Sequence, residues 1–193
     1  MIKNKKLLNR LASEALDLAK VLYPINRSIT GRGTHKTLKI LKSELNELKI
    51  KSFKSGSKVF DWKVPERWNI KTAKITRLNG EKVIDFNENN LHVVSYSESV
   101  KKKINFKELE KRIFTIPKMP NAIPYVTSYY NRTWGFCMSE DTKKKMTDDE
   151  YLVEIDSTFD NGPMYYGEYY LPGEKEDREI LFSTYVCHPS MVN

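Results

Sequence analysis

The sequence predicts an α/β protein in which helices come first and strands dominate the remainder. Residues 4–22 carry apolar side chains at spacings of three and four, which is the pattern of an amphipathic helix. Residues 58–130 instead carry short alternating or β-branched runs between turn signals. The last segment is an apolar run, residues 180–186, that leads into Cys187-His188-Pro189. Such runs are typical of a strand buried inside an α/β sheet.

Two helices and a short strand open the chain. The first helix is expected to end at Tyr23-Pro24, because a residue before proline disfavours the helical conformation. Thr34 is predicted to cap a second helix that runs to about Leu48, and a strand at 50–53 follows. The loop at 26–33 holds two glycines and could bind an anion at the helix start. It lacks the preceding strand and the following lysine of a phosphate loop, so a plain turn is favoured.

The middle of the chain is predicted to be a small β-rich module. Its clearest turn signal is Asn79-Gly80 between two β runs, which favours a hairpin. The remaining predicted elements are strands at 58–64, 73–78, 83–86, 91–96, 151–155, 164–171 and 179–186, with helices at 106–112 and 141–146.

Composition and charge set bounds on the class of protein. The chain has 193 residues, of which 39% are hydrophobic and 11% aromatic, so it can bury a core. It contains no apolar run near the roughly 20 residues that cross a bilayer. Its two cysteines form neither a disulfide framework nor a CxxC pair. We therefore expect a cytoplasmic protein that has no membrane partner.

The net charge of +8 is unevenly distributed. Residues 1–58 hold 14 Lys and Arg against 4 Asp and Glu, whereas residues 148–179 hold 2 against 11. A basic front could attract nucleic acid. Its lysines are spread along predicted helices without interleaved aromatic side chains, so solvated helix faces are the favoured interpretation.

His188 is the main candidate functional residue. A histidine at the carboxyl end of a strand suits a metal or proton-transfer role, and Pro189 stops strand pairing at this point. Asp156 and Asp160 could share a metal with it, although both equally suit turn positions. A thiol nucleophile at Cys187 is disfavoured, because neighbouring strand residues point to opposite faces. His35, in the first turn of the second helix, and His92, among β residues, are weaker candidates.

Several long motifs together resemble one known family. They are residues 23–31, 59–62 with 64–65, 91–97, 123–130 with 134–137, and 183–190. In this order they resemble the aminopeptidase-like proteins of the DUF4910 family, formerly described by its DUF2172 domain. That family is similar to zinc aminopeptidases of the M28 clan, with a β-rich domain inserted in the peptidase core and a winged-helix domain at the C-terminus.

The resemblance implies a domain organisation, a cofactor and a substrate class. Residues 1–57 would begin the peptidase-like core, residues 58–150 would form the β-rich inserted domain, and residues 151–193 would continue the core. Zn²⁺ would be the cofactor, His188 its first ligand, and a peptide or small amide with a free N-terminus the substrate.

The family pattern continues beyond the last residue of this chain. Family members carry a bridging Asp after the position of Asn193, then the general-base Glu, further ligands and the winged helix, and this chain has Val192 where a small residue is usual. We therefore expect an N-terminal fragment of a zinc aminopeptidase-like hydrolase that contains a metal ligand but no catalytic residue.

Two further expectations follow from the residues. The β-rich module, which is rich in Trp and Tyr, could instead serve as a non-catalytic binding module. The apolar run at 180–186 would be an unmated edge of the core sheet, so we expect self-association or poor solubility.

We predict that the purified chain cleaves no aminoacyl chromogenic substrate when zinc is added. Activation of water requires the other ligands and the general base of the implied site. A release of chromophore above the rate of a zinc-only blank would contradict this prediction.

Overall fold

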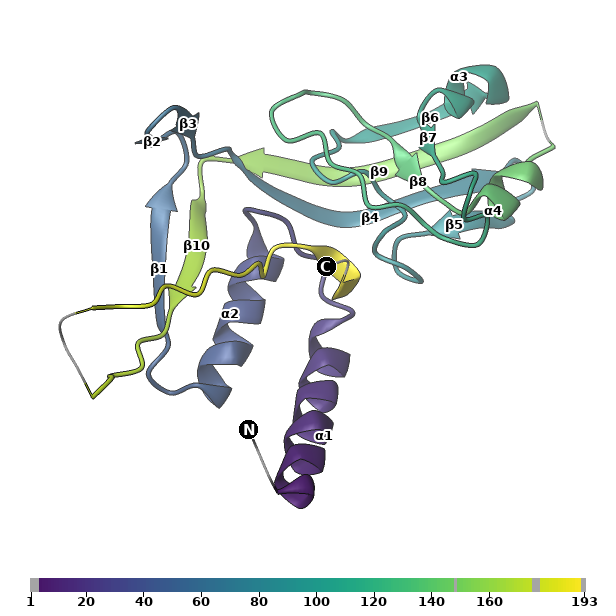
Figure 1. Cartoon of the computed structure of the whole chain (residues 1–193). Helices are drawn as coiled ribbons and strands as arrows, with labels where there is room; N and C mark the ends of the chain where they lie inside the picture. Colours follow the sequence, from purple (N-terminus) through teal and green to yellow (C-terminus); the bar gives the residue numbers. More distant parts are fainter. Residues whose placement is uncertain (1–3, 148, 175–177, 192–193) are drawn as a thin grey trace.

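In the computed structural model, residues 4–147, 149–174 and 178–191 are described. They form a mixed α/β molecule with two parts (Figure 1). One part holds the first two helices and a two-stranded sheet, and the other is built on a four-stranded sheet. The C-terminal segment passes over α2 and ends beside the loop that joins the two helices.

The first helix confirms its prediction and the second differs in its bounds. Helix α1 spans Lys5–Leu22, and the Asn4 side chain accepts hydrogen bonds from the first-turn amides. Helix α2 spans Arg32–Glu44, so it begins and ends earlier than predicted. Gly31, with φ of 117°, occupies the cap position that was predicted for Thr34. The Thr34 hydroxyl donates to the Ser28 carbonyl oxygen, and Thr34 lies inside the first turn rather than at the cap position.

The two helices bury different amounts of apolar surface. Of the residues in α1, only Leu22 is buried, and Leu8 and Leu11 are 50% and 42% exposed. Helix α2 buries Leu38 against the two-stranded sheet, where Gly167 provides the space for its side chain. The apolar stripe of α1 thus forms as predicted but lacks a cover among the described residues.

The smaller sheet joins segments that are distant in sequence. Strand β1 (Lys49–Lys54) pairs antiparallel with β10 (Pro163–Glu168). A short hairpin of β2 (Lys58–Val59) and β3 (Trp62–Lys63) follows β1 and leads into the larger sheet.

The larger sheet has four antiparallel strands in the order β5-β4-β9-β6. Its centre is formed by two strands of 11 residues, β4 (Arg67–Arg77) and β9 (Glu150–Asp160). Strand β5 (Lys82–Asp85) follows β4 through a turn in which Gly80 has φ of 90°, which confirms the Asn79-Gly80 hairpin. Strand β6 (Val100–Asn105) forms the other edge.

Short elements and loops cover one face of this sheet and close its core (Figure 1). They are α3 (Phe106–Glu110), β7 (Ile113–Phe114), β8 (Phe136–Cys137) and α4 (Glu140–Lys144). Trp68, Tyr96, Phe136 and Tyr151 are the largest side chains of the core, and each is at most 1% exposed. A final 3-10 turn, η1, covers Pro189–Met191.

Two predicted strands do not form. Residues 91–96 make only isolated bridges, at Val93 and Ser95, and Tyr96 leaves the extended region with φ of 68°. Among the described residues of the 179–186 run, none belongs to a strand, and Leu181 and Phe182 are 90% and 89% exposed. A strand requires a partner for its backbone donors and acceptors, and no strand among the described residues pairs with this run.

Several predictions stay open. Strand β9 belongs to the expected third segment, 151–193, yet it pairs with β4 and β6 of the β-rich sheet. The domain boundaries and self-association remain predictions. Val192 and Asn193 lie outside the described residues. Within the described part of the chain, none of the helices has the length and apolar character to cross a membrane.

We predict that Gly33→Ala destabilises the fold although alanine is the better helix former. An added Cβ at Gly33 would lie 1.7 Å from the Asn26 carbonyl oxygen, which is backbone and cannot give way easily. We expect a loss of about 2 kcal/mol or more in the free energy of unfolding in urea. Helix propensity alone would instead give a gain of about 1 kcal/mol. Lys36→Ala, at an exposed position of α2, is the control and should change stability by less than about 0.5 kcal/mol.

Candidate functional site

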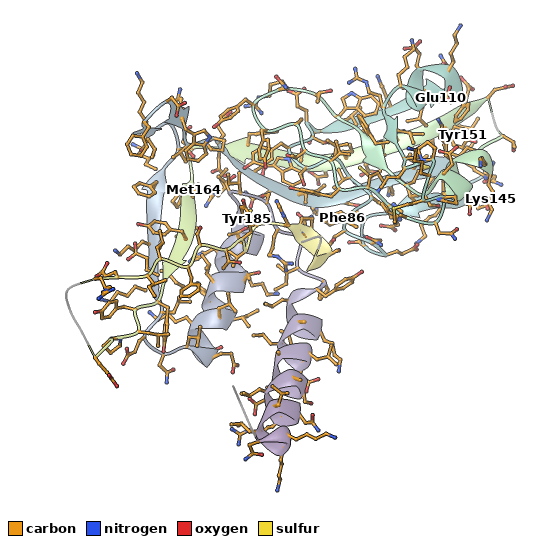
Figure 2. The ribbon with its side chains drawn as sticks, viewed as in Figure 1. Phe86, Glu110, Lys145, Tyr151, Met164 and Tyr185 are labelled. Atoms are coloured by element: carbon orange, nitrogen blue, oxygen red, sulfur yellow. The ribbon has the colours of Figure 1, made fainter. Side chains whose placement is uncertain are left out.

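His188 lies between two tyrosine rings where the C-terminal segment meets the β-rich part. Its ring centroid is 5.0 Å from that of Tyr125 and 5.5 Å from that of Tyr185. Figure 2 shows Tyr185 near the junction of the two parts of the molecule. The His188 Nδ1 atom is buried and has no hydrogen-bond partner among the described residues. Buried polar atoms are rarely left unpaired, so this nitrogen is a candidate ligand atom.

Arg27 holds the backbone of His188. Its Nε donates to the His188 carbonyl oxygen at 2.8 Å. The same guanidinium donates to the carbonyl oxygens of Leu22 and Ile25, at the end of α1. Arg27 is only 3% exposed, and burial lowers its pKa, yet an arginine stays protonated at neutral pH. One buried cation therefore joins the end of the first helix to the candidate ligand.

Ser190, two residues after His188, makes a second hydrogen-bonded contact that fixes the C-terminal segment. The Ser190 hydroxyl donates to the Asn90 side-chain oxygen, and Ser190 itself has φ of 50°. Asn90 also donates from Nδ2 to the Tyr23 carbonyl oxygen at 3.3 Å. The loop of the β-rich part that carries Asn90 thus contacts both the end of α1 and the turn after His188.

The loop between α1 and α2 docks on the β-rich part through Thr30. The Thr30 hydroxyl donates to the Glu66 carbonyl oxygen at 2.9 Å and lies 2.6 Å from the Tyr96 hydroxyl. It also accepts from the Trp68 amide at 3.2 Å. At the start of α2, the Arg32 amide donates to the Asn69 side chain at 3.0 Å. The Asn69 side chain thus accepts the amide hydrogen that an anion would otherwise take at this helix start. The structure agrees with a turn rather than an anion site.

Three tyrosines of the β-rich part form a cluster beside His188. Burial raises the pKa of Tyr125 to about 12, and it also raises the pKa of Tyr96 and Tyr129. The rings of Tyr96 and Tyr129 lie 5.8 Å apart. All three phenols are neutral at pH 7, so they present hydroxyl groups and aromatic faces but no negative charge.

Cys187 is half-buried and free. Burial raises the pKa of its thiol, and the nearby Arg27 partly opposes this shift. A thiol that stays protonated is a weak nucleophile, which is a further argument against a Cys187 nucleophile.

The two other histidines lie elsewhere and are already engaged. His35 stacks on Tyr165, with ring centroids 3.8 Å apart, and burial lowers its pKa. The His92 Nδ1 atom lies 2.8 Å from the Cys137 carbonyl oxygen, and burial lowers its pKa as well. Neither joins His188 in a common site.

The two candidate carboxylates are paired on the sheet. Asp160 accepts two hydrogen bonds from Arg67, at 2.8 and 2.9 Å, and Asp156 faces Lys71. Across residues 4–147, 149–174 and 178–191, no three His, Cys, Asp or Glu side chains come together in an arrangement that could hold a metal ion. His188 fits a zinc ligand by its chemistry, but the described residues supply one such donor where zinc takes three or four.

Two open clefts lie away from His188. They have volumes of about 600 and 580 Å³, and Thr147 and Asp149 line both of them. Figure 2 shows Glu110, Lys145 and Tyr151 at this end of the larger sheet, opposite the end near Tyr185. The clefts contain no histidine or cysteine.

Comparison with known proteins finds a family model that is similar to the β-rich part. Residues 67–158 match the family model described as "Domain of unknown function (DUF2172)". This segment covers most of the four-stranded sheet and its covering loops.

Two comparisons extend over nearly the whole chain. A protein of Clostridium acetobutylicum, described as "Putative polysaccharide biosynthesis protein with aminopeptidase-like domain", is 51% identical over 180 residues, which are 93% of this chain and 41% of that protein. A crystal structure described as that of a "putative peptidase" from the same organism is 49% identical, with a TM-score of 0.90, and the match covers 95% of this chain and 43% of that one. The chain thus spans about two fifths of the length of the relatives it matches.

Sequence reasoning identified His188 but not the residues around it. Arg27, Asn90 and Tyr125 lie 161, 98 and 63 positions before it in the chain. Arg27 and Tyr125 belong to the motifs that carry the family resemblance, and membership of these motifs is the sequence signal that could have pointed to them. Their contact with His188 depends on the tertiary fold.

We predict that Arg27→Lys lowers the free energy of unfolding by about 2–4 kcal/mol. A lysine donates from a single nitrogen, whereas the Arg27 guanidinium donates from two nitrogens to separate carbonyl oxygens. In the variant, at least one of these buried carbonyl groups would lose its donor. Urea unfolding measures the change. Arg10→Lys is the matched control, because Arg10 is exposed and only pairs with Glu14. An Arg27→Lys variant as stable as this control would contradict the role of Arg27 in joining the end of α1 to the His188 backbone.

Proposed function

We propose that this chain is the N-terminal part of a zinc-dependent aminopeptidase-like hydrolase of the DUF4910 type, related to the M28 clan. The whole enzyme would cleave an amide or peptide bond next to a free N-terminus. The observation that carries the proposal is the buried Nδ1 of His188, which lacks a partner among the described residues. The similarity to proteins named for peptidase activity supports it.

The domain organisation is part of the proposal. The β-rich domain would be an insertion in the peptidase-like core, which residues 1–57 begin and the C-terminal segment continues. Support comes from the pairing of β1 with β10, because these strands flank the β-rich domain at its two ends and still meet. Helix α2 packs on both strands. We also propose a cytoplasmic location, which rests on the cysteine usage.

In this proposal His188 would be one zinc ligand, as a neutral imidazole. Zinc, when bound, polarises a carbonyl group and activates a water molecule. The role of Arg27 would be to fix the backbone of the ligand through its hydrogen bond to the His188 carbonyl oxygen. Tyr125 and Tyr185 would restrict the rotation of the imidazole ring between them. The substrate would be a peptide or a small amide.

We predict that the 193-residue chain binds zinc weakly and that His188→Ala abolishes this binding. With a single donor among the described residues, the affinity should fall far below the roughly 10–16 kcal/mol of a complete structural site. Isothermal titration with ZnCl₂ measures the heat of binding.

His35→Ala is the matched control for this titration, because His35 stacks on Tyr165 away from the site. It should retain the heat of the unmodified chain. Equal heats for His188→Ala and the unmodified chain would contradict the metal role and would favour a non-catalytic binding module.

A further inference from the structure

We propose that α1 is a self-association surface, through which two copies of this chain pair with their α1 helices antiparallel. This inference goes beyond the proposed function and does not depend on the metal role of His188. It also places the contact on a helix rather than on the apolar run at 180–186.

The spacing of the apolar residues of α1 is the first argument. They alternate at intervals of three and four residues, which is the spacing that packs one helix along another. We call these five residues the seam: Leu8, Leu11, Ala15, Leu18 and Leu22. Such a spacing favours a second helix as the cover.

The exposure of the seam is the second argument. Leu8 is 50% exposed and Leu11 is 42% exposed, and of the residues in α1 only Leu22 is buried. Figure 1 shows α1 extending away from both sheets, whereas α2 packs on β1 and β10. Apolar side chains in water are unfavourable, so a helix that removes them from water is bound by their burial.

The charges of α1 indicate that the cover is an antiparallel second copy. Residues 5–10 hold three cations and no carboxylate, whereas residues 11–17 hold two carboxylates and no cation. A parallel copy would set the three cations of one helix level with the three cations of the other. Both carboxylates also pair with a cation of their own helix, but these pairs are exposed and rearrange at little cost.

An antiparallel pair centred on Ser13 uses these charges well. Its alignment places Arg10 between the levels of Glu14 of the partner subunit and Asp17 of the partner subunit. Opposite charges then face each other on the flank of the seam, which favours this orientation over the parallel one.

The same alignment packs the seam. It sets Leu11 against Ala15 of the partner subunit and Leu8 against Leu18 of the partner subunit. Leucine opposite alanine lets the two helices approach closely, and the two-fold axis makes each contact occur twice. The 18 residues of α1 form a helix about 27 Å long, so the bodies of the two subunits lie at opposite ends of the pair and leave the seam open.

The test is sedimentation velocity of the full 193-residue chain at about 5 to 200 µM, a range that covers weak association. The unmodified chain should show a monomer–dimer equilibrium. Leu11→Glu should raise the Kd of the dimer at least tenfold, because the two-fold axis places the added carboxylate in the seam twice. Leu11 is exposed, so the circular dichroism of the monomer should not change.

Leu16→Glu is the matched control, because Leu16 lies on the same helix outside the seam and is 57% exposed. Phe182→Glu tests the apolar run at 180–186, where Phe182 is 89% exposed. Each should leave the Kd within about twofold of the unmodified value. A chain that is monomeric at every concentration would overturn the inference. So would a Kd for Leu11→Glu no weaker than that for Leu16→Glu, or loss of the dimer in Phe182→Glu.

Cross-linking tests the orientation with the seam unaltered. The background is Cys187→Ser, in which the remaining cysteine, Cys137, is buried. A short bismaleimide should join Ala12→Cys to its copy, because position 12 flanks the seam beside the two-fold axis only in the antiparallel pair. Ser13→Cys faces away from the seam and should stay uncrosslinked on a denaturing gel. Equal cross-linking at both positions, or none at position 12, would overturn the antiparallel pairing.

Discussion

The hydrogen bonds of the buried Arg27 guanidinium fix the position of the candidate ligand. They join the carbonyl oxygens of Leu22 and Ile25, at the end of α1, to that of His188 at the other end of the chain. A buried cation must satisfy its donors, so these two backbone segments can separate only at a high cost in free energy. Three polar residues of the loop after α1, Arg27, Ser28 and Thr30, are buried.

The same loop orients the β-rich part relative to the helices. Thr30, three residues after Arg27, bonds to Glu66 and Tyr96 on that part, and Asn90 returns a contact to the end of α1. His188 therefore lies where two parts of the molecule meet, which is where ligand sites are most often built. The β-rich part contributes Tyr125 directly to this place, so an inserted domain would form one wall of the site.

Local sequence patterns predicted the local elements well. The stripe from Leu8 to Leu22 and the Asn79-Gly80 turn were sufficient for α1 and the β4–β5 hairpin, because both depend on neighbouring residues. The long strand β9 was predicted only to Ile155. Most of its last residues are polar, and they form contacts such as those of Ser157 with Ser97 and Asp160 with Arg67.

The predictions that failed concern features that depend on contacts between residues distant in sequence. The run at 180–186 has the composition of a buried strand but no described partner, and a strand is defined by its partner. Residues 93–96 are buried, and burial alone does not make a strand. The surroundings of His188 escaped sequence reasoning because its neighbours come from three distant segments, which only the fold brings together.

The most direct test of the metal role is a zinc titration followed through the imidazole nitrogens by long-range ¹⁵N–¹H correlation NMR. The chain has 3 histidines, so each ring can be assigned by single substitution. If His188 is a zinc ligand, its ring nitrogens alone should shift as zinc is added, whereas those of His35 and His92 should remain in place. Shifts confined to His35 or His92, or no shift in any ring, would contradict the assignment of His188.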